Sequence, residues 1–123
     1  MSRSFLIAQL SDSHVLPRGE LLSDHVDTGA RLERAVARVN ALDPRPQIAV
    51  LSGDLVNSGS REEYAVLREI LTPLTIPFYL MPGNHDLPDR MRESFPEHAY
   101  LNQNGQYVNY VIEGFPVRII VLD

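Results

Sequence analysis

The sequence predicts an α/β fold that begins with a parallel sheet. Three short apolar runs are typical of buried strands, and the two longer segments between them carry apolar residues three or four positions apart, as amphipathic helices do. Strands that alternate with helices are joined by crossover connections, which make neighbouring strands parallel. Two further apolar runs with a turn between them predict a hairpin after this unit.

The first strand is predicted over Phe5 to Leu10, a run with a single polar residue. Residues 15–29 hold two glycines and a proline among polar residues and predict a long loop. The first helix is predicted over Ala30 to Leu42, because the apolar residues at positions 32, 35, 36, 39 and 42 share one face. The prolines of Asp43-Pro44-Arg45-Pro46 then end this helix, since proline cannot continue one.

The second and third strands are predicted over Ile48 to Leu51 and over Ile76 to Met81. Between them, Ser60 to Glu63 form a capping box, in which a serine N-cap is followed three residues later by a glutamate. A second helix therefore starts there, and its apolar face begins with Tyr64. A short helix is predicted over Asp89 to Phe95.

The hairpin strands are predicted over Tyr107 to Ile112 and over Val117 to Leu122. The turn between them is Glu113-Gly114-Phe115-Pro116, which contains the glycine and proline that turns favour. The whole order is therefore β-α-β-α-β followed by a hairpin.

Length and composition restrict the class of protein. The 123 residues are 44% hydrophobic and 22% charged, which predicts one globular domain over residues 1–123. A net charge of −5 argues against nucleic acid as a partner, and the lack of cysteine excludes disulfides and thiolate sites. The N-terminal apolar run is too short for a signal peptide, so we expect a cytoplasmic protein with no membrane partner.

Polar side chains follow each of the three predicted parallel strands. Ligands bind at the carboxyl ends of the strands in such sheets, so we expect these side chains to meet at one edge. The candidate residues are Asp12, His14, Asp54, Asn84, His85 and Asp86.

The first two clusters contain ligands for a transition metal. On an extended segment, Asp12 and His14 point to the same side, and a carboxylate with an imidazole suits a divalent ion. Taken alone, Asp12 is also typical of an aspartate that caps the following loop. Asp54 follows Gly53, and Gly-Asp is equally a common turn dipeptide.

The third cluster combines a ligand with an acid–base group. The Asn84 oxygen can bind a metal, His85 can donate a proton, and Asp86 can orient that imidazole through a hydrogen bond. The alternative is an asparagine-containing turn with a histidine at the surface.

Together the three motifs resemble the calcineurin-like metallophosphoesterase superfamily. They are Asp-x-His at Asp12, Gly-Asp at Asp54 and Gly-Asn-His-Asp ending at Asp86. The wider segments at residues 9–14, 52–59 and 81–86 are most similar to class III cyclic nucleotide phosphodiesterases and the related glycerophosphodiesterases. The resemblance runs from residue 5 to residue 123 and implies the N-terminal half of an αββα sandwich.

The resemblance also implies a dinuclear metal site. Asp12 and His14 match ligands of the first metal, Asp54 matches the bridging carboxylate, and Asn84 matches a ligand of the second metal. His85 matches the catalytic histidine outside the coordination sphere. The implied reaction is hydrolysis of a small phosphodiester by a hydroxide that two iron, manganese or zinc ions activate.

The sequence departs from the family pattern in its histidines. The family uses a later histidine and a Gly-His-x-His pair, and neither follows Asp123. His25 and His98 lack that context, and we expect both to be solvated surface residues. We therefore expect an N-terminal part of a longer enzyme that is inactive alone and that oligomerises or needs its other half.

Three alternatives differ in chemistry. A protein Ser/Thr phosphatase would carry Asp-Arg-Gly where this chain has Asn57-Ser58-Gly59, which argues against that subfamily. A nuclease or a lipid-precursor hydrolase of the same superfamily stays open, because specificity lies in loops. The alternative of another class is a catalytically incomplete fragment that acts as a binding or self-associating module.

Overall fold

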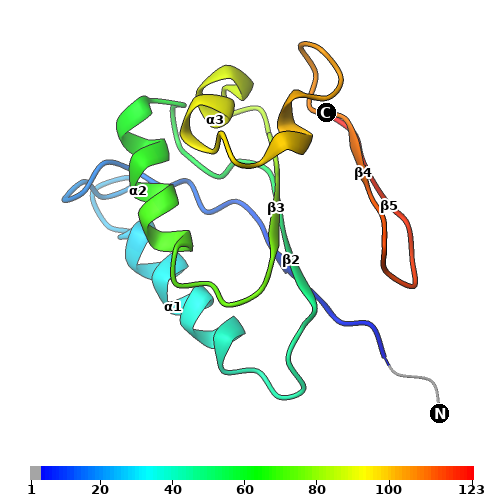
Figure 1. The fold of residues 1–123 in the computed structure, drawn as a ribbon. Helices are drawn as coiled ribbons and strands as arrows, with labels where there is room; N and C mark the ends of the chain where they lie inside the picture. The colour runs from blue at the N-terminus through cyan, green and yellow to red at the C-terminus, as the bar shows by residue number, and fades with distance from the viewer. Residues whose placement is uncertain (1–3) are drawn as a thin grey trace.

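A computed structural model describes residues 4–123 of the chain and confirms the predicted α/β fold class (Figure 1). Its elements, in chain order, are β1 (Ile7–Leu10), α1 (Thr28–Asn40), β2 (Ile48–Ser52), α2 (Arg61–Leu71), β3 (Phe78–Met81), α3 (Pro88–Ser94), the 3₁₀ helix η1 (Ala99–Asn102), β4 (Tyr110–Ile112) and β5 (Ile119–Val121). The sheet has the order β1-β2-β3 with parallel pairing, and β4 and β5 form a separate antiparallel pair.

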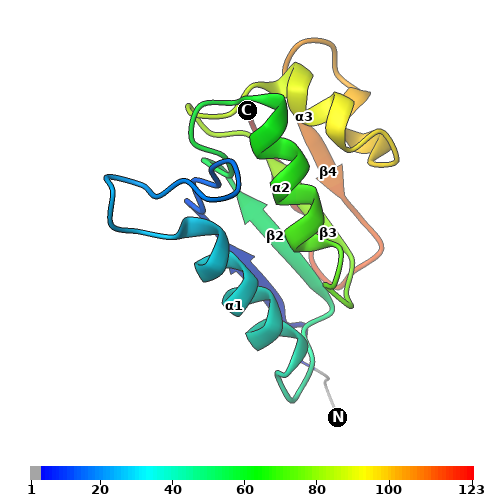
Figure 2. The same cartoon turned by 90° about the vertical axis from the view of Figure 1, so that its left-hand side faces the viewer.

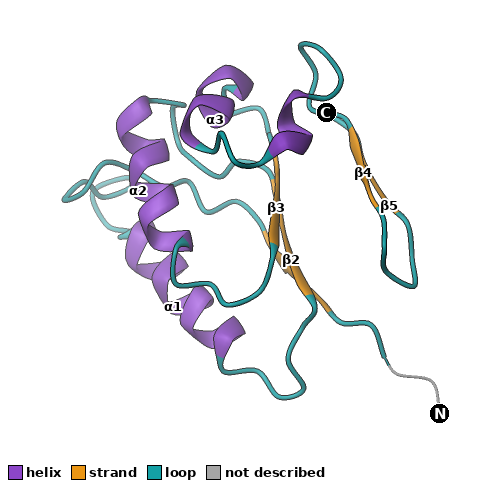
Figure 3. Cartoon of the chain, in the orientation of Figure 1, coloured by secondary structure: helices purple, strands orange, loops and turns teal. Residues whose placement is uncertain are grey.

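The elements form layers around the parallel sheet. Helices α1 and α2 cover one face of the sheet, and the β4–β5 hairpin lies on its other side (Figures 2 and 3). Strand β2 lies between β1 and β3, and its residues from Ile48 to Leu51 are buried. None of the helices in residues 4–123 has the length and apolar character that a membrane crossing requires.

The register of the sheet brings the three strand ends to one edge. Leu10 pairs with Leu51, and Leu51 pairs with Leu80. The loops that follow these residues therefore leave the sheet side by side, as predicted for the carboxyl ends of parallel strands.

Side-chain caps start both main helices. The Asp27 carboxylate accepts a hydrogen bond from the Ala30 N–H at 2.9 Å at the start of α1. The predicted capping box of α2 is confirmed, because the Ser60 hydroxyl accepts from the Glu63 N–H and the Glu63 carboxylate accepts from the Ser60 N–H. Glu63 is 1% exposed and also accepts from the Ser58 N–H at 2.9 Å, which fixes the segment leading into α2.

Most predicted boundaries differ from the structure by one to three residues, and the end of α1 shows why. Helix α1 ends at Asn40, and Leu42 lies beyond it with 46% of its surface exposed. The Ala41 N–H bonds back to the Ala37 and Arg38 carbonyls and closes the helix before the prolines are reached. The hairpin strands are shorter than predicted, and helix η1 has no counterpart in the sequence-based prediction.

The expectation that His98 is a solvated surface residue is wrong. Its side chain is 14% exposed and packs against the rings of Phe78 and Phe95, with centroids 5.0 and 5.4 Å away. Its Nδ1 lies 2.7 Å from the Tyr100 hydroxyl, and that hydroxyl also accepts from the Leu80 N–H of β3. His25, by contrast, is exposed as expected.

Burial of His98 should make stability depend on pH. Burial lowers the pKa of His98 below its ordinary value of 6.5, and Glu97, 3.6 Å from Nε2, offsets part of that effect. The unfolded chain then takes up the proton more readily, so the contribution is present above about pH 6.5 and is lost as the pH falls. We expect the urea midpoint to fall less between pH 7 and pH 5.5 in His98→Gln than in the native chain. The His25→Gln control should keep the native fall, and an unchanged fall in His98→Gln would contradict the assignment.

Candidate metal centre

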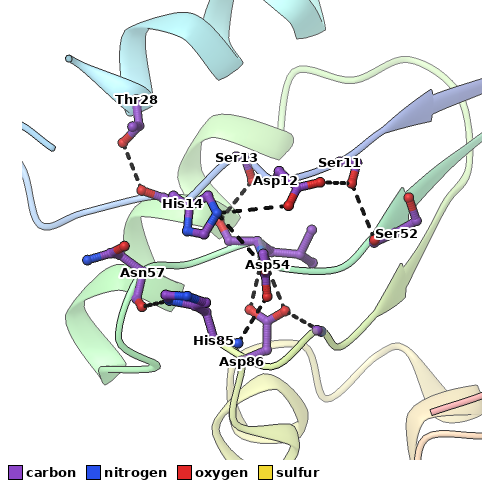
Figure 4. Close-up of polar contacts among 12 residues, drawn as sticks. Ser11, Asp12, Ser13, His14, Thr28, Ser52, Asp54, Asn57, His85 and Asp86 are labelled. Atoms are coloured by element: carbon purple, nitrogen blue, oxygen red, sulfur yellow. Dashed lines mark hydrogen bonds and ion pairs between the residues drawn. The ribbon is translucent and has the colours of Figure 1, made fainter.

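The loops after β1 and β2 are joined by backbone hydrogen bonds. The Asp12 N–H donates to the Gly53 carbonyl at 3.0 Å, and the His14 N–H donates to the Asp54 carbonyl at 3.0 Å. Because these bonds hold the two segments side by side, the side chains of Asp12, His14 and Asp54 project into one space (Figure 4).

The backbone at these three residues is left-handed. The φ angles are 57° at Asp12, 42° at His14 and 49° at Asp54. The sequence-based premise that Asp12 and His14 lie on an extended segment is therefore wrong, although their side chains do converge. Residues other than glycine rarely adopt positive φ, and such strain is concentrated where a surrounding structure holds functional groups in place.

The convergent atoms have the spacing of ligands to one ion. His14 Nε2 lies 3.9 Å from Asp12 Oδ1 and 3.9 Å from Asp54 Oδ2, and one ligand atom from each residue falls within 4.8 Å of the others. Two atoms that are each about 2.1 Å from one ion lie at most about 4.2 Å apart. The two 3.9 Å separations are too long for hydrogen bonds and fit a shared ion.

Among residues 4–123, neither nitrogen of the His14 imidazole has a hydrogen-bond partner. Within residues 4–123, its Nδ1 is the one buried side-chain polar atom without a partner, and the side chain is 22% exposed. Buried polar groups are nearly always paired, and exceptions cluster at functional sites. His14 Nε2 faces the carboxylates of Asp12 and Asp54 without a hydrogen bond to either, so it is the nitrogen placed to bind an ion, and the donor set of one imidazole and two carboxylates suits a divalent transition metal.

Glycines allow the third loop to approach the other two. A Cβ on Gly83 would lie 2.5 Å from the Asp54 nitrogen, and a Cβ on Gly53 would lie 3.2 Å from the Gly83 Cα. This close approach brings the Asn84 amide against Asp54. Assigned from its hydrogen bonds, the Asn84 amide nitrogen donates to both Asp54 oxygens at 3.1 and 3.2 Å.

His85 lies on the exposed side of the same group. Its N–H donates to Asp54 Oδ1 at 3.0 Å, and its ring meets the His14 ring edge-on with centroids 4.8 Å apart. His85 Nδ1 lies 2.6 Å from the main-chain carbonyl of Asn57. Because a carbonyl can only accept, Nδ1 carries the proton and Nε2 faces away from Asn57 as the free ring nitrogen.

The expected hydrogen bond from the His85 ring to Asp86 is not formed. Its buried carboxylate instead accepts from three main-chain N–H groups, those of Gly83 at 2.7 Å, Leu55 at 3.1 Å and Val56 at 3.2 Å. These donors belong to the loops that carry Asp54 and Asn84, so Asp86 ties those loops together. Burial raises the pKa of the Asp86 carboxyl, and the N–H donors offset part of the rise.

Sequence reasoning missed two contributors to this arrangement. The Asn57 carbonyl contacts His85, but a main-chain group leaves no signature in the sequence. Tyr64 is fully buried on the predicted apolar face of α2, yet its hydroxyl accepts from the Leu87 N–H at 3.0 Å and donates to Asp86 at 3.4 Å. A tyrosine among aliphatic core residues was the available signal, since buried hydroxyls usually have a partner.

Comparison with known proteins agrees with this geometry. A family model described as calcineurin-like phosphoesterase matches residues 5–121. The chain belongs to the calcineurin-like phosphoesterase family. The resemblance found in the motifs is thereby confirmed, and the parallel three-stranded sheet is consistent with an N-terminal part of that fold.

Several curated bacterial proteins are similar to this member of the family. A probable glycerophosphodiester phosphodiesterase of Arcobacter nitrofigilis is 36% identical over 96% of this chain and 43% of its own length. The glycerophosphodiester phosphodiesterase of Enterobacter lignolyticus is 35% identical over the same shares. A 3′,5′-cyclic adenosine monophosphate phosphodiesterase of Pseudomonas aeruginosa is 31% identical over 98% of this chain and 42% of its own length. The chain thus spans less than half the length of these relatives.

Proposed function

We propose that this chain carries part of the active site of a metal-dependent phosphodiesterase. The observation that carries the proposal is the convergence of Asp12, His14 and Asp54 from two strand ends. The relatives named as phosphodiesterases support the reaction class, because they match almost the entire chain.

The chain's own side chains would hold the metal ions. Asp12 and His14 would bind the first ion, Asn84 the second, and Asp54 would bridge both. The Asn84 side chain lies beside both Asp54 oxygens, and turning its amide over would direct the Asn84 oxygen toward an ion held there, which supports this division. Bound iron, manganese or zinc ions would supply Lewis acidity for the phosphate and lower the pKa of a water molecule.

His85 is the proposed general acid. The Asn57 carbonyl holds the Nδ1 proton, so Nε2 must first take up a second proton to give the imidazolium, and Nε2–H would then donate that proton to the phosphate or the leaving oxygen. Asp86 is proposed as a positioning residue for this step, since its hydrogen bonds fix the loops that carry Asp54 and His85. Tyr64 would support it through the bond between its hydroxyl and Asp86.

The proposed substrates are small phosphodiesters of the glycerophosphodiester or cyclic nucleotide kind. We expect the manganese-loaded whole protein to hydrolyse bis-(p-nitrophenyl) phosphate faster than p-nitrophenyl phosphate, with activity lost in a chelator and restored by the metal. Release of p-nitrophenolate measures both rates. A preference for the monoester would contradict the substrate class, and hydrolysis that persists after metal removal would contradict the mechanism.

The second candidate function is a self-associating binding module. It is favoured by the outer face of the hairpin, where the cross-strand pair Val111 and Ile120 is 47% and 63% exposed and Leu122 is 78% exposed. Contiguous apolar surface promotes association. Under this proposal the chain elutes from a sizing column as an oligomer and Ile120→Glu shifts it toward the monomer, whereas a monomeric native chain would contradict it.

A further inference from the structure

A cavity of about 360 Å³ lies beside the candidate metal centre. Its walls come from the segment after β1, the loop before α1 and the first turns of α1. Asp12 and His14 belong to this lining, so a phosphate held at the metal centre would border the cavity. The rest of the lining is largely apolar, from Leu10, Leu22, Val26, Leu32 and Ala35.

One cation lines the cavity, and it has no acidic partner. Arg31, the fourth residue of α1, is exposed and makes no ion pair or side-chain hydrogen bond within residues 4–123. Arg34, Arg38 and Arg90 are likewise unpaired within residues 4–123, but Arg31 alone among these arginines lines the cavity. Asp12 is the one carboxylate in the lining, and a metal ion bound there would offset its charge.

We propose that this cavity receives the second ester arm of an acyclic phosphodiester, which a cyclic nucleotide lacks, and that Arg31 selects arms that end in an anionic group. The inference rests on the proposed function, because it assigns a substrate class to the same site. A volume of about 360 Å³ is within the usual range for small-molecule sites, and the apolar walls suit an aliphatic stem. A free guanidinium at the cavity suits a carboxylate or phosphate, which it can bind through two parallel hydrogen bonds.

A pair of non-hydrolysable ligands tests the inference without depending on turnover. Methyl(4-carboxybutyl)phosphinate and methyl(pentyl)phosphinate present the same phosphinate to the metals, and their arms differ only at the terminal group. Titration calorimetry on the manganese-loaded protein should give a dissociation constant about tenfold lower for the carboxylated ligand, since one charge-assisted hydrogen-bonded pair is gained. In Arg31→Met the two constants should agree within about twofold, because the charge is removed while the stem is retained.

Arg34→Met is the matched control. Arg34 is also exposed on α1 but does not line the cavity, so its variant should keep the native difference. The inference is overturned if the native protein binds both ligands equally or binds neither, or if Arg31→Met still prefers the carboxylate. A protein that hydrolyses bis-(p-nitrophenyl) phosphate and binds both phosphinates equally has the proposed function without this subsite. A protein that binds the carboxylated phosphinate more tightly but does not hydrolyse bis-(p-nitrophenyl) phosphate has the subsite without the proposed function.

Discussion

Asp54→Ala is expected to abolish metal binding and phosphodiester hydrolysis together. The Asp54 carboxylate lies beside candidate ligands from both other loops, with His14 Nε2 3.9 Å away and the Asn84 amide within 3.2 Å. Removing it takes a ligand from both proposed ions, and the remaining groups at either ion are too few to fix its geometry. Metal content per chain, measured by mass spectrometry after dialysis, and turnover of bis-(p-nitrophenyl) phosphate by the whole protein should fall to background.

Two further variants separate ligand loss from misfolding. Asp54→Asn keeps the shape of the side chain and an oxygen that can accept from the His85 N–H, but it removes the charge, so we expect a folded protein that binds metal poorly. Glu20→Ala removes a carboxylate from the exposed loop and should leave metal content unchanged. If Asp54→Ala kept both metals and full turnover, the bridging role would be wrong.

His85→Ala is expected to slow hydrolysis by about 10²–10⁴-fold while metal content stays near normal, as the loss of one general acid does. The structure gives His85 contacts that differ from those of His14. Its Nδ1 is bound by the Asn57 carbonyl, and it is His14 Nε2 that faces the carboxylates of Asp12 and Asp54. The turnover number and the metal content of the whole protein measure the two effects separately.

His25→Ala is the control for removing a histidine from the exposed surface. It should leave both turnover and metal content at native values. Loss of metal from His85→Ala would show that His85 is a ligand, and unchanged turnover would show that the proton comes from another group.

The sequence was sufficient to predict that the three loops meet. Strand identity followed from apolar runs, and parallel pairing follows from the alternation of strands with helices, so the ends of β1, β2 and β3 had to share an edge. The register of Leu10 with Leu51 and of Leu51 with Leu80 then brings the motifs together.

The details inside the site were not predictable in the same way. Whether Asp12 and His14 adopt extended or left-handed backbone depends on hydrogen bonds to residues about forty positions away, such as that from the Asp12 N–H to the Gly53 carbonyl. The sequence predicts that Asp86 contacts its neighbour His85, but the turn directs its carboxylate to the N–H groups of Leu55 and Val56 instead. Contacts that depend on tertiary packing override local expectation at both places.

Tertiary packing also explains why the prediction of a solvated His98 was wrong. Nothing in the residues around it indicates burial, because the side chains that cover it, Phe78 and Phe95, come from β3 and from the end of α3.

Anomalous diffraction from zinc-loaded crystals tests the central claim most directly, because it locates the ion without relying on activity. The account predicts an anomalous peak bonded to a carboxylate oxygen of Asp12, to His14 Nε2 and to a carboxylate oxygen of Asp54, each at about 2.0–2.2 Å. A peak bound by other residues, or an unoccupied space among these three side chains at saturating zinc, would contradict the metal centre.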